Sequence, residues 1–266
     1  MAAALSGRPR SGAPPCRTSG RGDPGVTRVL ITGGGSGTGA DMARAFADAG
    51  HEVIITGRRM ERLAQVATGG IRAVAGDVSD PDQVRAMFDQ AGPCQIVIAN
   101  AGVAEAAPFA RVDLEHWSHM IATNLTGTFL TFQQGLARMQ TGGRLIAVAS
   151  IAGLRGAAYA APYAASKHGV MGLVRSLAHE VAKKGITVNA ICPGFLDTDM
   201  TRRSIANIID KTGRDEAEAL ASLTARNPQG RLVAPSEVTG TAMWLTSPSA
   251  ASVNGQAIML DGGESA

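Results

Sequence analysis

The 266-residue chain has few aromatic side chains and no long apolar segment. Aromatic residues make up 4% of the sequence, which leaves little surface on which the bases of a nucleic acid could stack. The longest apolar runs, around 145–149 and 169–174, are much shorter than the roughly 20 residues that a membrane-spanning helix needs. These absences argue against a membrane protein and against a nucleic-acid-binding protein.

Cysteine is scarce as well, and the three residues present, Cys16, Cys94 and Cys192, lie far apart. They match neither a disulfide framework nor a zinc site. No His, Cys and carboxylate residues are spaced like metal ligands, so we expect no metal. Because unpaired thiols are typical of a reducing compartment, we expect a cytoplasmic protein.

The net charge of +3 resides in residues 1–25, which contain four arginines and one aspartate. The rest of the chain is balanced between acidic and basic side chains, so it offers no phosphate-neutralising surface for a nucleic acid. The composition of 1–25, rich in Gly, Pro, Ser and Arg, predicts a disordered tail. Two other interpretations stay open: a targeting peptide, which its prolines disfavour, and an artefact of a translation start near Val26.

From Arg28 onward, short β-branched segments alternate with longer amphipathic segments, a pattern that predicts βαβ units. We expect one α/β domain over 26–266, with a Rossmann-type, doubly wound parallel sheet of about seven strands flanked by helices. The expected strands are 28–32, 52–56, 71–75, 95–99, 144–149, 186–191 and 256–260. Ligands of such sheets bind beyond the carboxyl ends of the strands.

A glycine-rich turn, T-G-G-G-S-G-T-G at 32–39, follows the first expected strand and precedes an amphipathic helix. Glycines there let a pyrophosphate approach the backbone N–H groups of a helix N-terminus. A flexible loop has a similar composition, but the place of this turn between strand and helix favours a dinucleotide site. Its spacing, T-G-x-x-x-G-x-G, resembles that of the short-chain dehydrogenase/reductase family.

The end of the second expected strand favours NADP(H) over NAD(H). Where an NAD-binding fold usually has a carboxylate, this chain has Gly57, followed by Arg58 and Arg59. A guanidinium pairs well with the 2′-phosphate of NADP(H). The alternative is that both arginines are solvated residues at the start of a surface helix.

Ser150, Tyr163 and Lys167 carry the expected chemistry. Ser150 ends the fifth expected strand, and Tyr163 and Lys167 share the sheet-facing side of a helix expected over about 160–183. We expect the Lys167 ammonium, together with the positive nicotinamide ring of the oxidised cofactor, to lower the pKa of Tyr163, which then exchanges a proton with the substrate, while Ser150 hydrogen-bonds the substrate oxygen. A half-buried Tyr or a snorkelling Lys is common singly, but the conjunction with Ser150 favours catalysis.

Asn124 lies beside an apolar stripe that runs through Leu114 and Trp117 to Phe132, on one long helix expected over 113–139. A polar amide on such a stripe needs hydrogen-bond partners. It either bonds to local backbone or uses a water molecule to connect Lys167 with solvent. The segment N-L-T-G-T-F resembles the family's segment and favours the second role.

The resemblance to classical short-chain dehydrogenases/reductases covers about 28–263. It implies an NAD(P)-dependent enzyme that transfers a hydride between the cofactor and a secondary alcohol or ketone, without a metal. The catalytic residues that it implies are Asn124, Ser150, Tyr163 and Lys167. The cofactor-binding residues that it implies are Gly33, Gly35, Ser36, Gly37, Thr38, Gly39, Arg58, Asp77, Val78, Asn100, Ala101, Gly102, Tyr163, Lys167, Pro193, Gly194 and Thr198. One departure is Ala99, since the family pattern there is N-N-A-G.

The residues around Tyr163 and Lys167 indicate a substrate class. The segments N-P-Q-G-R-L-V-A-P-S-E-V and A-A-P-Y-A-A-S-K-H-G look similar to reductases of 3-oxoacyl thioesters and polyketides. The sequence of 197–230 predicts helices that form a lid over the site. Arg155 is expected to contact an anionic group.

The sequence leaves two rival functions open. One is a catalytically silent, dinucleotide-binding sensor or scaffold of the same fold. The weaker one is a nucleotide-sugar epimerase or dehydratase, for which we expect a larger substrate domain after Thr198. The resemblance also implies a homo-oligomer, a tetramer or a dimer, with the last strand at a subunit contact.

Overall fold

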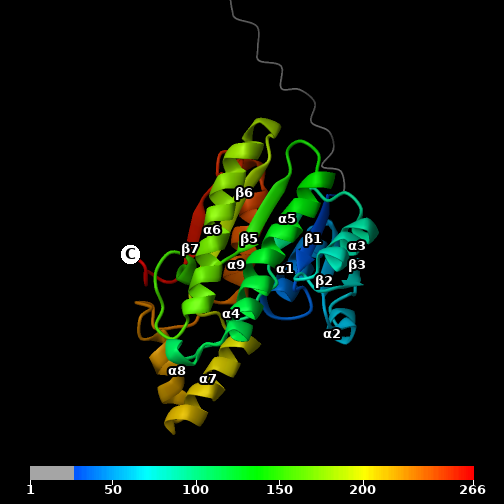
Figure 1. The fold of residues 1–266 in the computed structure, drawn as a ribbon. Helices are drawn as coiled ribbons and strands as arrows, with labels where there is room; N and C mark the ends of the chain where they lie inside the picture. The colour runs from blue at the N-terminus through cyan, green and yellow to red at the C-terminus, as the bar shows by residue number, and fades with distance from the viewer. Residues whose placement is uncertain (1–26) are drawn as a thin grey trace, which may run out of the picture.

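Seven parallel strands form one sheet in the order β3-β2-β1-β4-β5-β6-β7 (Figure 1). The strands are β1 (Arg28–Thr32), β2 (Glu52–Gly57), β3 (Ile71–Ala75), β4 (Ile96–Ala99), β5 (Arg144–Val148), β6 (Thr187–Pro193) and β7 (Ala257–Leu260). The computed structural model describes residues 27–266, so the expectations for 1–25 lie outside the described residues. The predicted doubly wound sheet is confirmed.

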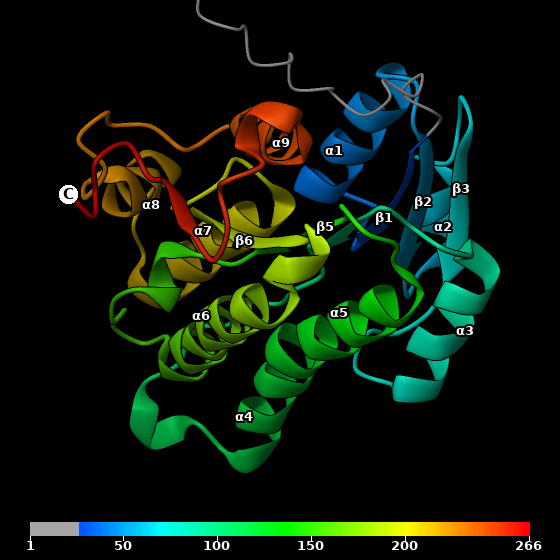
Figure 2. The same cartoon turned by 90° about the horizontal axis from the view of Figure 1, so that it is seen from above.

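Helices cover both faces of the sheet, as Figure 2 shows. They are α1 (Gly37–Asp48), α2 (Met60–Ala64), α3 (Pro81–Ala91), α4 (Leu114–Ile121), α5 (Gly127–Arg138), α6 (Ala161–Val181), α7 (Asp199–Thr212), α8 (Glu216–Thr224) and α9 (Pro235–Thr246). One buried cluster joins the sheet to α3, α5 and α6, and a second joins its other face to α1 and α9. Strands buried on both faces explain the continuous apolar runs in the sequence.

The strand order reverses between β1 and β4, and one threonine holds the two strand ends together. The Thr32 hydroxyl accepts hydrogen bonds from the backbone N–H groups of Asn100 (3.0 Å) and Ala101 (3.1 Å). The Asn100 side chain donates to the Thr32 carbonyl at 3.0 Å. These bonds set the geometry of the crevice in which ligands of this fold bind.

The expectation of one long helix over 113–139 is wrong. A π-helical turn, Ala122–Thr126, separates α4 from α5. This wider turn changes the angular phase of the side chains, so residues spaced for one continuous helix no longer share a face. Leu114 is therefore 77% exposed and Trp117 37% exposed, whereas Phe132 is in the core. Asn124 lies within the π turn and is fully buried.

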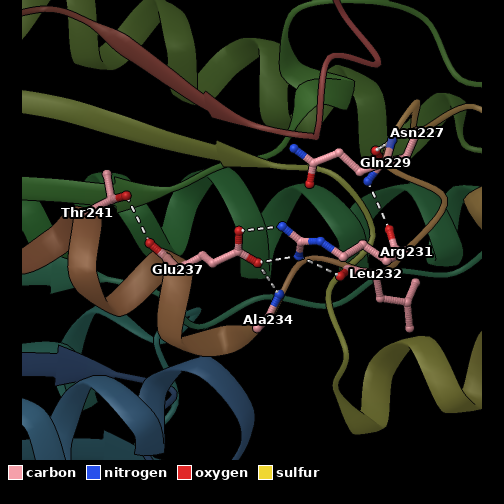
Figure 3. Close-up of polar contacts among 7 residues, drawn as sticks. All are labelled: Asn227, Gln229, Arg231, Leu232, Ala234, Glu237 and Thr241. Carbon is pink, nitrogen blue, oxygen red and sulfur yellow. Dashed lines mark hydrogen bonds and ion pairs between the residues drawn. The ribbon is translucent and has the colours of Figure 1, made fainter.

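The segment after α8 is tied to the start of α9 by a bidentate ion pair (Figure 3). Arg231 donates to both carboxylate oxygens of Glu237, at 2.7 and 3.0 Å, and Glu237 also accepts from the Ala234 N–H at 2.8 Å. The Asn227 side chain donates to the Arg231 carbonyl at 2.9 Å and accepts from the Gln229 N–H at 2.8 Å. The hydrogen bonds from Arg231, followed by the one from Ala234, lower the pKa of Glu237 to about 2.

Within 27–266, no helix has the length and apolar character that crossing a membrane would require. The same part of the chain contains no group of three or more His, Cys, Asp or Glu side chains arranged to hold a metal ion. Cys94 and Cys192 are buried free thiols.

Replacing Glu237 by Gln should reduce the free energy of unfolding by about 1 kcal/mol at neutral pH, because the start of α9 loses its charged capping partner. The pKa of Glu237 falls from 4.5 to about 2 on folding, so its contribution is full above about pH 4.5 and declines as the pH drops toward 2. Urea unfolding of both proteins at several pH values measures this difference. A difference that stays constant down to about pH 2 would contradict the assignment.

Candidate active site

The glycine-rich turn between β1 and α1 forms a cradle at the end of the sheet. Ser36 is the N-cap residue of α1, and its side chain makes no capping hydrogen bond, so the helix N-terminus is open to an anion. A Cβ atom on Gly39 would collide with the Gly33 carbonyl oxygen and lie 2.6 Å from the Asn100 side-chain nitrogen. Only glycine fits there, so the turn is shaped as a dinucleotide cradle needs.

Residues expected to contact the adenosine end of the cofactor converge near the ends of β2 and β3. Arg58 Nη1 lies 3.9 Å from Asp77 Oδ2. The other oxygen of Asp77 accepts from the N–H and hydroxyl of Ser79, at 2.9 and 2.7 Å. Val78 is buried, and its side chain packs against Gly127 of α5. Arg58 is therefore an exposed cation, 60% accessible, with the Asp77 carboxylate beside it.

The segment after β6 reaches back to the glycine turn. The Thr198 methyl carbon lies 3.4 Å from where a Cβ on Gly37 would be, so these two predicted cofactor contacts adjoin. Gly194 donates its N–H to the Leu260 carbonyl at 3.0 Å, and the preceding Pro193 carbonyl faces Ser150. The structure thus brings the end of β6 between the glycine turn and the predicted catalytic residues.

Ser150 and Tyr163 have adjacent hydroxyl groups. Ser150 caps the short 3₁₀ turn Ile151–Gly153, where its oxygen accepts from the Ala152 N–H at 3.1 Å. It donates a long hydrogen bond of 3.4 Å to the Pro193 carbonyl. Burial raises the pKa of Tyr163 above its usual value, and a hydrogen bond with Ser150 opposes that rise. The Ser150 hydroxyl is therefore positioned to serve both Tyr163 and a substrate oxygen.

Lys167 is buried, with 5% of its surface exposed, and its ammonium donates to the Val148 carbonyl at 3.0 Å. Its Nζ lies 5.7 Å from the centroid of the Tyr163 ring. Burial lowers the pKa of Lys167 to about 8, which leaves the group protonated at neutral pH. Burial raises the pKa of Tyr163 in the protein without cofactor, so the lowering expected from Lys167 together with the oxidised nicotinamide ring stays a prediction.

The Asn124 side chain bonds to the backbone of Val103, which is distant in sequence, and to the hydroxyl of Ser166. Its oxygen accepts from the Val103 N–H at 2.8 Å, and its nitrogen donates to the Val103 carbonyl at 2.9 Å and to Ser166 Oγ at 3.1 Å. A Cβ on Gly102 would lie 3.2 Å from Asn124 Oδ1 and 3.7 Å from Lys167 Nζ. The missing side chain of Gly102 thus leaves space that borders both groups.

Sequence analysis missed several residues that support the site. Thr32 begins the glycine motif and could have been found there, because its hydroxyl directly precedes the first glycine of the motif. Ser166, fully buried beside Lys167, has no local signal beyond its place in the motif. The role expected for Arg155 needs correction: its guanidinium pairs with the buried carboxylate of Glu264, so it is not a free cation.

A family model described as enoyl-(acyl carrier protein) reductase matches residues 33–265. The chain belongs to the short-chain dehydrogenase/reductase family. The resemblance deduced from the sequence is thereby confirmed, and membership makes the protein an NAD(P)-dependent oxidoreductase. The silent-scaffold alternative receives no support.

Several short-chain dehydrogenases/reductases with named activities are similar over most of their length. The granaticin polyketide synthase putative ketoacyl reductase 1 of Streptomyces violaceoruber is 37% identical over 249 residues, covering 88% of this chain and 92% of the relative. The 3-oxoacyl-[acyl-carrier-protein] reductase MabA of Mycobacterium tuberculosis is 37% identical over 253 residues, covering 92% and 96%. A solved variant of actinorhodin polyketide ketoreductase with NADPH has a TM-score of 0.83 at 34% identity, covering 90% and 97%.

Replacing Gly39 by Ala should weaken NADPH binding by at least about tenfold, which corresponds to about 1.4 kcal/mol, because the new methyl group forces the turn open. Fluorescence titration with NADPH measures the change. Gly172→Ala, on the exposed side of α6, is the matched control, since its new methyl group meets no heavy atom within 4 Å. Unchanged affinity in Gly39→Ala would show that the turn does not hold the cofactor.

Proposed function

We propose that the protein is an NADP(H)-dependent ketone reductase that acts on 3-oxoacyl thioesters, including polyketide intermediates. The observation that carries the proposal is the buried Lys167 ammonium at the carboxyl end of β5, 5.7 Å from the centroid of the Tyr163 ring, with Ser150 capping the turn that follows the same strand. The names of the relatives at 37% identity support the substrate class.

When bound, NADPH would supply the hydride that the carbonyl carbon of the substrate accepts. Ser150 donates a hydrogen bond to the carbonyl oxygen, which positions the group and stabilises the negative charge that develops on it. Tyr163 gives its phenolic proton to that oxygen and so completes the alcohol. Because burial raises the pKa of Tyr163, the phenol is protonated and ready to donate at neutral pH.

The role of Lys167 is to place a positive charge near the Tyr163 ring. When Tyr163 has given up its proton, the ammonium, 5.7 Å from the ring centroid, stabilises the phenolate. Reprotonation of Tyr163 needs a path to solvent. We place one water molecule in the space beside Gly102, where it would contact Asn124 Oδ1 and Lys167 Nζ.

The described residues fit NADP(H) at both ends of the cofactor. The uncapped N-terminus of α1 would hold the pyrophosphate, and Arg58 would pair with the 2′-phosphate while Asp77 accepts from the adenine amine. Thr198 and the backbone at Pro193 would hold the nicotinamide end. NAD(H) lacks the 2′-phosphate, so it would lose the contact with Arg58.

The lid, the assembly and the location form part of the same proposal. Helices α7 and α8 follow Thr198 directly, so they would close over the substrate. The exposed apolar side chains include Leu114, Trp117 and Phe129 on α4 and α5, and Trp244 and Met259 on α9 and β7. Two different self-complementary surfaces would produce a tetramer with dihedral symmetry. The buried free thiols agree with a cytoplasmic location.

Tyr163→Phe should reduce kcat with acetoacetyl-CoA by about three orders of magnitude or more, because the variant lacks the proton donor. NADPH binding should stay within about twofold of wild type, since the ring is kept. Loss of NADPH absorbance measures the rate, and fluorescence titration measures the binding. Turnover at the wild-type rate would remove Tyr163 from proton transfer. No reduction of any 3-oxoacyl thioester or simple ketone by wild-type protein would refute the proposed function.

Arg58→Ala should raise the KM for NADPH by about tenfold or more and leave that for NADH within about twofold, because only NADPH carries the phosphate that Arg58 would bind. Arg85→Ala is the matched control, since Arg85 is an exposed arginine paired with Asp82 on α3. Steady-state kinetics with both cofactors give the comparison. Equal losses for NADPH and NADH would exclude the phosphate contact.

A further inference from the structure

The segment that follows β7 folds back against the candidate active site. Its turn is held by two hydrogen bonds, from the Gly263 N–H to Asp261 Oδ1 (3.1 Å) and from the Glu264 N–H to the Asp261 carbonyl (3.2 Å). Glu264 Oε2 lies 3.6 Å from where a Cβ on Gly194 would be. Gly194 directly follows Pro193, whose carbonyl accepts from Ser150, so the Glu264 carboxylate lies beside the segment that contacts Ser150.

Arg155 approaches the same place from the other side. It follows Ser150 by five residues, in the loop that leads to α6, and its guanidinium pairs with Glu264. The Glu264 side chain is 4% exposed and that of Arg155 is 33% exposed. The loop has a second anchor, because the Tyr159 carbonyl accepts from the Ala107 N–H at 2.9 Å. The pair thus joins the loop after Ser150 to the segment after β7.

The net charge of this pair affects which substrates bind at the proposed site. A lone guanidinium beside Ser150 would draw in a carboxylate, because a cation in a partly buried site is poorly screened. Glu264 cancels that charge. Asp261, which is 7% exposed and packs against Gly194, adds a second carboxylate. An anionic substrate would therefore meet side chains whose summed charge is zero or negative.

We propose that the Arg155–Glu264 pair is a specificity determinant that makes the site select uncharged ketones and thioesters and reject keto carboxylates. This inference rests on the proposed function and names the part of its substrate range that the pair sets. The pair also positions the loop after Ser150, because a buried carboxylate without its cation is strongly unfavourable. Neutral residues at both positions would leave no free guanidinium to bind a carboxylate, so the discrimination would be kept.

The test replaces Glu264 by Gln, which removes the negative charge and keeps the shape. We expect the ratio of kcat/KM for acetoacetate to kcat/KM for ethyl acetoacetate to rise by about tenfold, because Arg155 becomes free to bind the carboxylate. The double variant R155Q/E264Q should restore the ratio to within about twofold of wild type. Glu237→Gln is the matched control, since it breaks an arginine–glutamate pair at α9 and should leave the ratio unchanged.

A binding measurement keeps this test separate from the proposed function. Calorimetry with malonate and the NADP⁺ complex should show tighter binding to Glu264→Gln than to wild type, with an affinity that falls as salt increases. Glu264→Met gives the same comparison if the amide variant does not fold. An unchanged substrate ratio and unchanged malonate affinity in a folded variant would overturn the inference. Failure of wild-type protein to reduce any ketone would refute only the proposed function, because the malonate comparison needs no turnover.

Discussion

A single buried cation constrains the active site more than any other group. The Lys167 ammonium is almost fully removed from water, at a cost that the hydrogen bond to the Val148 carbonyl only partly offsets. Satisfying it requires α6 to pack closely on the end of β5. That packing in turn places Tyr163 one helical turn away and next to Ser150. The lowered pKa of Lys167, about 8, records the remaining cost of burial.

The reversal of strand order between β1 and β4 supplies the second constraint. Thr32 joins the two strand ends, so the glycine turn and the segment Asn100–Gly102 share one edge of the sheet. The site is then completed by chain that is distant in sequence. Thr198 lies across Gly37, and Glu264 lies beside Gly194. The segments that line the crevice thus come from different crossovers of the fold. The segments that bind the substrate can therefore change while those that bind the cofactor are kept.

Local sequence patterns predicted the elements that depend on local physics. The strands appear within two residues of their predicted ranges because buried parallel strands have a strong apolar signal. The helix that contains Asn124 could not be predicted as it is, because a π turn is stabilised by contacts of the folded chain and not by local propensity. Arg155 was misassigned for a related reason. Its partner Glu264 is near it only in the folded chain.

The sequence by itself determined the parallel sheet, the glycine cradle and the order of Ser150, Tyr163 and Lys167, since each follows from short-range spacing. Only the tertiary structure decided the charge states at the site. It raised the pKa of Tyr163 by burial, lowered that of Lys167, and cancelled the charge of Arg155 with a carboxylate. Electrostatic free energies depend on burial and on distances between groups, and both exist only once the chain has folded.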